Sequence, residues 1–144
     1  MGTLQRFEHK EDCLTIVASR GFSSDALRHS AKVRRETNSS CAAALILRRM
    51  RVFVEDVSTS YLYVGTRELD VLQATGVAAV QSTLIIGSDG RFRGVFSTHF
   101  HAPKVMSSFG RMPLNQLAER MASCMEALED LAPSDLLPSL EMLR

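Results

Sequence analysis

Three cysteines carry the most reactive side chains of this 144-residue chain, and Cys41 has the most suggestive position. It follows the helix-capping residues Ser39 and Ser40, at the start of an expected helix whose dipole lowers the pKa of a thiol. Residues 42–123 contain no cysteine, so a redox centre at Cys41 has no resolving thiol nearby in the sequence. We therefore favour a buried small residue at this position. The odd cysteine count and the absence of C-x-x-C disfavour a disulfide framework or a zinc site.

Hydroxyl side chains occur on two stretches that we expect to be neighbouring strands. Ser82 and Thr83 lie on the first stretch, and Ser97 and Thr98 lie on the second. Hydroxyls among apolar neighbours suit a polar ligand that is held by a few directed hydrogen bonds. Cross-strand Ser and Thr pairs also stabilise sheets without any ligand. We give the two interpretations equal weight.

His99 and His101 alternate along the second of these stretches, so both side chains could face one side of a strand. Together with His29 or Asp56 they would offer ligands for a metal ion. Two histidines without a third ligand in sequence are a weak signal, and we expect no metal and no cofactor. A hydrogen-bonded pocket or sheet residue is the favoured interpretation of His99.

Seven of the 17 basic residues cluster between Arg28 and Arg51, with Glu36 as the only acid among them. This cluster could steer an anionic ligand such as a cyclic nucleotide or a carboxylate, but a solvated basic face is favoured. A net charge of +1 and few aromatic residues argue against nucleic-acid binding. No apolar run reaches the roughly 18 residues of a membrane span, and no signal-peptide pattern is present. We expect a cytoplasmic chain without a membrane partner.

The apolar patterns predict the elements that would position these side chains. Residues 78–86 and 92–100 flank a Ser-Asp-Gly turn, which predicts an antiparallel hairpin. The interleaving of strands and helices around this hairpin indicates an α/β (α+β) fold with a largely antiparallel sheet. Further strands are expected at residues 4–7, 13–19 and 51–57, and helices at residues 23–35, 41–47 and 66–76.

The last long element is the clearest helix, because apolar residues recur at spacings of three and four. Its seam consists of Leu114, Leu117, Met121, Cys124, Leu128 and Leu131. We expect this seam to cover one face of the sheet, where six buried side chains would contribute on the order of 10 kcal/mol before entropy is counted. Pro133 ends the helix, so we predict one domain over residues 1–132 and a short C-terminal extension over residues 133–144.

Several stretches in matching order resemble the GAF domains of bacterial signalling proteins, particularly those linked to PAS domains and histidine kinases. The stretches are Leu14 to Phe22, Ser40 to Leu45, Arg51 to Val57, Ala78 to Thr83, and the hairpin from Gly87 to Phe100. The resemblance runs from Leu4 to Met125. Two features depart from the pattern. The long helix that normally precedes the first strand is absent or truncated, and Ala42 stands where glycine is usual.

The resemblance implies a central antiparallel sheet with the terminal helix on one face and a small-molecule pocket on the other, roofed by helices and loops. It implies a ligand-sensing module that is not an enzyme, a homodimer through the Leu114–Leu131 helix, and a signalling partner in trans. The alternative is a degenerate GAF fold that serves dimerisation or protein docking without a ligand. GAF-fold enzymes that reduce free methionine sulfoxide need further cysteines within the pocket loops, and residues 42–123 of this chain contain none. The candidate ligand-binding residues are Cys41, Asp56, Ser82, Thr83, Ser97 and His99.

Overall fold

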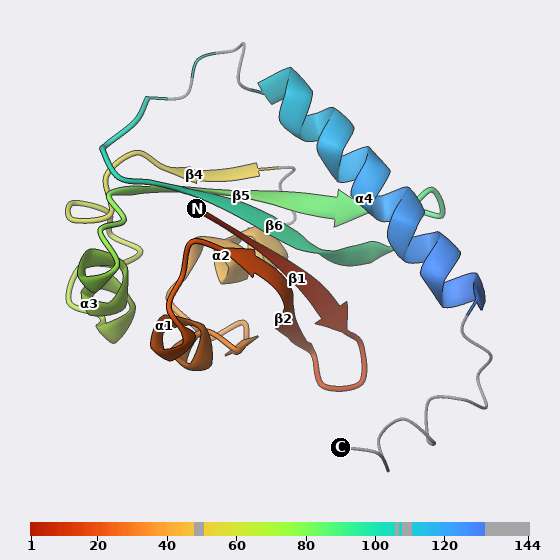
Figure 1. Ribbon diagram of the computed structural model, residues 1–144, viewed down its shortest axis with the longest axis horizontal. Helices are drawn as coiled ribbons and strands as arrows, with labels where there is room; N and C mark the ends of the chain where they lie inside the picture. Colours follow the sequence, from red (N-terminus) through yellow and green to blue (C-terminus); the bar gives the residue numbers. More distant parts are fainter. Residues whose placement is uncertain (48–50, 106, 108–110, 132–144) are drawn as a thin grey trace.

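The computed structural model describes residues 1–47, 51–105, 107 and 111–131 (Figure 1). The strands are β1 (Gly2–Glu8), β2 (Cys13–Arg20), β3 (Lys32–Val33), β4 (Arg51–Val54), β5 (Ala79–Ile86) and β6 (Phe92–Phe100). The helices are α1 (Ser24–His29), α2 (Ser40–Leu47), α3 (Arg67–Ala74) and α4 (Arg111–Leu131). The predicted extension over residues 133–144 lies outside the described residues.

The six strands form one sheet in the order β3-β2-β1-β6-β5-β4, and every neighbouring pair is antiparallel. This confirms the predicted fold class and the hairpin between β5 and β6. β1 lies in the middle of the sheet because it pairs with β6 as well as with β2. Gly94 makes that approach possible, since a Cβ atom at this position would lie 2.1 Å from the carbonyl oxygen of Gln5.

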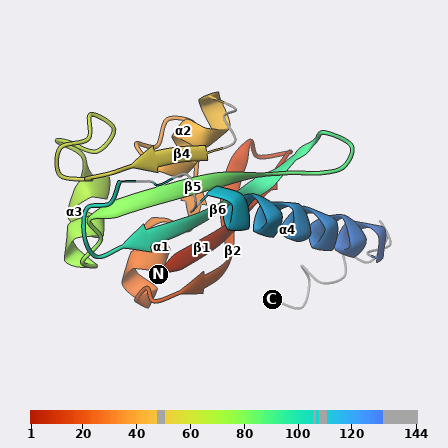
Figure 2. The same ribbon diagram turned by 90° about the horizontal axis from the view of Figure 1, so that it is seen from above.

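Alternation along the strands divides the core between two faces of the sheet. On one face Leu84 and Val95 pack against α2 through Ala44. On the other face Ile85 and Phe96 pack against α4. Figures 1 and 2 show α4 crossing one face, while α1, α2 and α3 gather on the opposite side. The sheet is therefore covered by one long helix and, across from it, by three short ones.

The predicted orientation of α4 is wrong for most of its apolar seam. The small residues Ala118 and Ala122 face the sheet, with Leu114, Met121 and Met125 partly buried beside them. Small side chains let the helix axis approach the strands closely, so the packing face is centred on the alanines. The remaining seam residues, Leu117, Cys124, Leu128 and Leu131, are exposed.

The other elements follow the prediction with two differences at their ends. The helix expected over residues 23–35 stops at His29, and the chain then forms the short strand β3 against β2. The strand expected over residues 51–57 ends at Val54. The caps of α3 are as predicted: Thr66 accepts a hydrogen bond from the amide of Leu69 at 3.3 Å, and Gly76 follows with a φ of +72°. Among the described residues, no helix is both long and apolar enough to cross a membrane.

A pocket between the sheet and the short helices

A buried cluster of hydroxyls and one thiol joins the N-terminus of α2 to the sheet. The Oγ atoms of Ser82 and Ser97 lie 2.7 Å apart across β5 and β6. Ser40 reaches Ser82 at 2.8 Å between Oγ atoms, and the Cys41 Sγ lies 3.1 Å from the Oγ of Ser97. The amide of Ser40 donates to the hydroxyl of Tyr63 at 2.8 Å, which satisfies one of the N–H groups that a helix leaves unpaired at its start.

This cluster changes the role that the sequence suggested for its members. Ser82 and Ser97 are fully buried and bond to each other and to α2, and neither lines the pocket. Cys41 does line the pocket, but burial raises the pKa of its thiol. The helix dipole was expected to lower that pKa; removal from water outweighs it here, because the thiolate is the form that burial penalises. Cys41 is therefore held as a neutral thiol.

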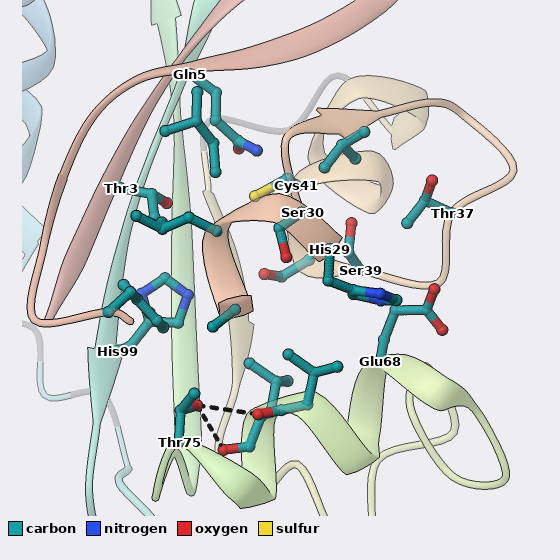
Figure 3. A pocket seen from close by; sticks show the side chains of 18 of the residues that line it. Thr3, Gln5, His29, Ser30, Thr37, Ser39, Cys41, Glu68, Thr75 and His99 are labelled. Atoms are coloured by element: carbon teal, nitrogen blue, oxygen red, sulfur yellow. Dashed lines mark hydrogen bonds between the residues drawn. The ribbon is translucent and has the colours of Figure 1, made fainter. Parts of the chain in front are cut away.

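The pocket itself is a cavity of about 180 Å³ beside this cluster. The sheet supplies one wall, which includes Thr3, Gln5 and His99. The helices supply the facing wall, which includes His29 of α1 and Glu68 of α3. Figure 3 shows Gln5 and His99 on the sheet side and His29 and Glu68 across the cavity from them. The predicted location of the pocket, on the face opposite α4, agrees with this arrangement.

Two side chains of the sheet wall carry buried polar atoms without a partner among the described residues. These are the Oε1 atom of Gln5 and the Nδ1 atom of His99. Gln5 is only 2% exposed, so bulk water does not solvate its amide. Each buried polar group that lacks a hydrogen bond costs about 1–3 kcal/mol. The sheet side of the pocket is therefore polar, and two of its polar atoms have no partner among the described residues.

His99 presents a neutral imidazole to the pocket. Burial lowers its pKa to about 4, and the nearby ammonium group of Met1 acts in the same direction. The ring of Phe22 stands edge-on to the imidazole with the centroids 4.8 Å apart. The favoured interpretation was a hydrogen-bonded pocket or sheet residue: His99 does line the pocket, but its Nδ1 atom has no hydrogen-bond partner among the described residues. A neutral imidazole offers one donor and one acceptor to a ligand.

Two predicted ligand-binding residues lie elsewhere. Thr83 points to the α4 face, because it neighbours Ser82 on a strand, and its Oγ1 accepts a hydrogen bond from Arg51 at 3.3 Å. Asp56 closes an exposed turn, where its Oδ1 accepts from the amide and the hydroxyl of Ser58 at 2.8 Å and 2.6 Å. Neither residue contributes to the pocket wall.

The two histidines considered for a metal ion do not share a site. His101 is exposed beyond the end of β6, and its Nδ1 lies 2.9 Å from the carbonyl oxygen of Gly76. His99 faces the pocket instead. Within the described part of the chain, no group of three His, Cys, Asp or Glu side chains is placed to hold a metal.

Three members of the basic cluster pair with nearby acids, whereas Arg48 and Arg49 lie outside the described residues. Arg35 binds both carboxylate oxygens of Asp12 at 2.8 Å and 2.9 Å. Lys32 pairs with Glu11, and Arg28 pairs with Asp25. The carboxylate of each pair compensates the cation, so these three basic residues give little attraction for an anionic ligand. A solvated basic face, as favoured from the sequence, describes them best.

Sequence reasoning missed Gln5 and Glu68 as pocket residues. The alternation of Thr3, Gln5 and Phe7 along β1 carried a signal, since a strand in the middle of a sheet must bury Gln5 on one of its faces. We expected only a short strand near the start of the chain, where no burial was evident. Glu68 lies in the first turn of a helix, where acidic residues are common because they interact favourably with the helix dipole. Its position in the sequence therefore gives no indication that it lines a pocket.

A second cavity of about 480 Å³ lies on the same side of the sheet, at the opposite end of β5 and β6 from His99. Its floor is apolar, with Leu84, Ile86 and Phe92, and Arg35 lies at its rim. None of its described lining residues carries a buried polar atom that lacks a partner. The smaller pocket is therefore the better candidate for a specific ligand.

Comparison with known proteins identifies the architecture. No family model matches the sequence, and no curated protein sequence matches it. The GAF domain region of a Geobacter sulfurreducens protein superposes with a TM-score of 0.70 at 14% identity, covering 88% of this chain and 80% of that chain. The GAF domain of an Acinetobacter phosphoenolpyruvate-protein phosphotransferase gives 0.68 at 11% identity, covering 90% and 72%. The chain has the GAF fold.

Enzymes share this GAF fold. The free methionine-R-sulfoxide reductase of Neisseria meningitidis, solved with its substrate, superposes with a TM-score of 0.71 at 15% identity, covering 91% of this chain and 70% of that chain. A second such reductase, from Thermoplasma acidophilum, gives 0.67 at 15% identity. The prediction that the chain is not an enzyme is therefore wrong as a conclusion from the fold, because the same GAF architecture carries catalysis in these proteins.

Proposed function

We propose that this GAF domain is a regulatory module that binds a small metabolite in the pocket between the sheet and α1 and α3. The observation that carries this proposal is the pair of orphaned polar atoms on Gln5 and His99. A ligand that donates or accepts hydrogen bonds at these atoms recovers the free energy that their burial costs the empty protein. Ser97, which lines up with Thr3 across the strands, needs no ligand because Cys41 and Ser82 satisfy it.

The size of the pocket limits the class of ligand. A cavity of about 180 Å³ is below the roughly 300–1,000 Å³ of drug-sized sites. This favours an occupant the size of an amino acid or a small amine over a cyclic nucleotide or a larger chromophore.

The alternative is a GAF fold kept only for dimerisation or docking, with no ligand. That interpretation calls for an interior in which side chains fill the space beside Cys41 and satisfy the polar atoms there. The cavity and the Oε1 atom of Gln5, which has no partner among the described residues, favour the ligand-binding module instead.

A thermal-shift screen tests the proposal. The panel contains amino acids, free methionine sulfoxide, small amines, amides, carboxylates and cyclic nucleotides. A compound at 100 times its Kd should stabilise the protein by about 2.7 kcal/mol, with the melting temperature rising further as its concentration increases. If every class leaves the melting temperature unchanged at millimolar concentration, the ligand-free alternative is preferred and the proposal fails.

We further propose that a second copy of this chain covers the exposed seam of α4, and that the dimer acts on a signalling partner in trans. Leu128 and Leu131 are 66% and 77% exposed, and they lie on one side of the helix with Leu117 and Cys124. Such an apolar stripe is typical of a helix–helix interface.

Sedimentation at micromolar concentration tests the dimer with a matched pair of variants. Leu128→Glu places a charge on the seam and should convert the dimer to monomer. Gln116→Glu adds the same charge on the exposed polar side of α4 and should leave the dimer intact. A monomeric wild-type protein at high micromolar concentration would contradict this part of the proposal.

A further inference from the structure

The lining of the pocket carries one carboxylate without an ion-pair partner, and this charge defines the class of ligand. Glu68 stands in the first turn of α3 and is partly buried. Among the described residues, no basic side chain forms an ion pair with it. Figure 3 shows Glu68 rising from α3 toward His29, across the cavity from Gln5 and His99.

Lys32, the one lysine or arginine on the described lining, does not compensate this carboxylate. Lys32 lines the pocket, but its Nζ atom binds Glu11 of the turn between β1 and β2. The cation is therefore already balanced outside the cavity. The negative charge of Glu68 remains as the uncompensated charge of the pocket wall.

The charge of Glu68 also reaches the buried end of the site. Burial raises the pKa of Tyr63 to about 12, and the negative charge of Glu68 adds to the rise. The hydroxyl of Tyr63 accepts the hydrogen bond that fixes the start of α2. Glu68 therefore lies close enough to Tyr63 for its charge to influence the buried end of the pocket.

The sheet wall is neutral and includes unused acceptor capacity. The Oε1 atom of Gln5 is an acceptor that no described residue satisfies, and an N–H or O–H group of a ligand would satisfy it. The thiol of Cys41 and the imidazole of His99 add no charge to this wall. A carboxylate or phosphate ligand would be repelled by Glu68 and would find Lys32 already paired with Glu11. The Met1 ammonium beside this wall donates to the carbonyl oxygen of His99, and Met1 does not line the pocket.

We propose that the pocket selects small cationic ligands, with an ammonium or guanidinium group against Glu68 and an N–H or O–H donor directed at Gln5. This inference rests on the proposed ligand-binding function and names the chemistry of its ligand. An amine that also carries an amide or hydroxyl group has both features.

Four-carbon compounds matched in length test the charge preference by calorimetry. The probes are 4-aminobutanamide, putrescine, succinamate and succinate. The two amines should bind, and 4-aminobutanamide should bind more tightly than its anionic counterpart succinamate by at least about tenfold, because one carries an ammonium group where the other carries a carboxylate.

Variants of α3 assign the effect to one carboxylate. Glu68→Gln keeps the size of the side chain and should weaken 4-aminobutanamide by about tenfold or more. Asp70→Asn removes an equal charge from the same helical turn, at an exposed position outside the pocket, and should leave the affinity unchanged. This control separates direct contact from a general change in charge or in helix stability.

The outcomes distinguish this inference from the proposed function. Tighter binding of succinamate or succinate, or equal affinity of wild type and Glu68→Gln for the amines, overturns the cationic class while ligand binding stands. If none of the four probes binds, the cationic class is overturned as well. If no compound of the wider thermal-shift screen stabilises the protein, the proposed function itself is contradicted.

Discussion

The side-chain amide of Gln5 determines how the empty pocket and the filled pocket compare in stability. Its Oε1 atom is buried without a partner among the residues that the structure describes, which costs the unliganded protein about 1–3 kcal/mol. Gln5→Leu removes that cost and should raise the free energy of unfolding of the unliganded protein by about 1 kcal/mol. The same change should abolish stabilisation by ligands, as measured by urea unfolding with and without the best compound of the screen.

Gln81 supplies the matched control for this substitution. It is equally buried, its Nε2 atom also has no partner, and it faces α4 rather than the pocket. Gln81→Leu should stabilise the protein by a similar amount and leave ligand binding unchanged. If both variants lose the ligand, the effect comes from general changes in the sheet and not from contact with Gln5.

His99 should make stability depend on pH between about 6.5 and 4. Its pKa is lowered to about 4 in the folded protein, against about 6.5 for an unfolded chain. In this interval the unfolded chain binds a proton that the folded protein does not. Stability is therefore complete above pH 6.5 and falls as the pH decreases to 4, by up to about 3 kcal/mol.

Urea midpoints measured at pH 7 and pH 5 report this effect. His99→Gln should flatten the difference between the two midpoints, and His9→Asn, at an exposed position, should keep it. An undiminished slope in His99→Gln would assign the pH dependence to other groups.

At the scale of single residues, the sequence supported Cys41 and His99 as pocket residues but not the chemistry around them. The position of Cys41 at the start of α2 was predictable, whereas its burial against Ser97 required the crossing of α2 over the sheet. Thr83 was chosen with Ser82 because both carry hydroxyls, although adjacent residues of a strand face opposite sides. Gln5 could not be recognised until β1 was known to lie between β2 and β6.

At the scale of the elements, α4 depends on small residues for its contact with the sheet. Ala122 is 3% exposed and packs with Ile85 and Phe96. Ala122→Leu would force the helix away from the strands and should destabilise the protein by about 1–3 kcal/mol. Ala127→Leu, on an exposed position of the same helix, should change stability by less than about 0.5 kcal/mol in urea unfolding. Equal costs for the two variants would contradict the assigned packing face.

The periodicity of the sequence predicted where α4 lies along the chain but not which side of it faces the sheet. Leucines and alanines both follow a helical period, and the larger leucines dominated the prediction. Where α4 comes closest to the sheet, only the small side chains of Ala118 and Ala122 fit between them. The side of the helix that carries Leu117, Leu128 and Leu131 therefore faces outward. The two-residue strand β3 was missed for a different reason, because it is too short to show an alternation.

At the scale of the whole molecule, β6 connects the pocket to α4. His99 lines the pocket on one face of this strand, while Phe96 packs against α4 on the other. A bound ligand that rigidifies β6 should therefore slow hydrogen exchange in both β6 and α4. Protection limited to α1 and α3 would contradict this connection. Hydrogen exchange measured by mass spectrometry with and without ligand reports the difference, with β4 as an internal reference.

The pairing of β1 with β6 also sets an order of events during synthesis. The hairpin of β1 and β2 is complete within the first 20 residues, yet its inner edge finds its partner only at Gly94 to Thr98. A ribosome that adds roughly 5–20 residues per second leaves this edge unpaired for several seconds. An unpaired strand edge invites association with other chains. The nascent chain should therefore be most prone to aggregation until β6 has emerged, and the long sequence separation of this contact should make sheet closure the slow step of folding.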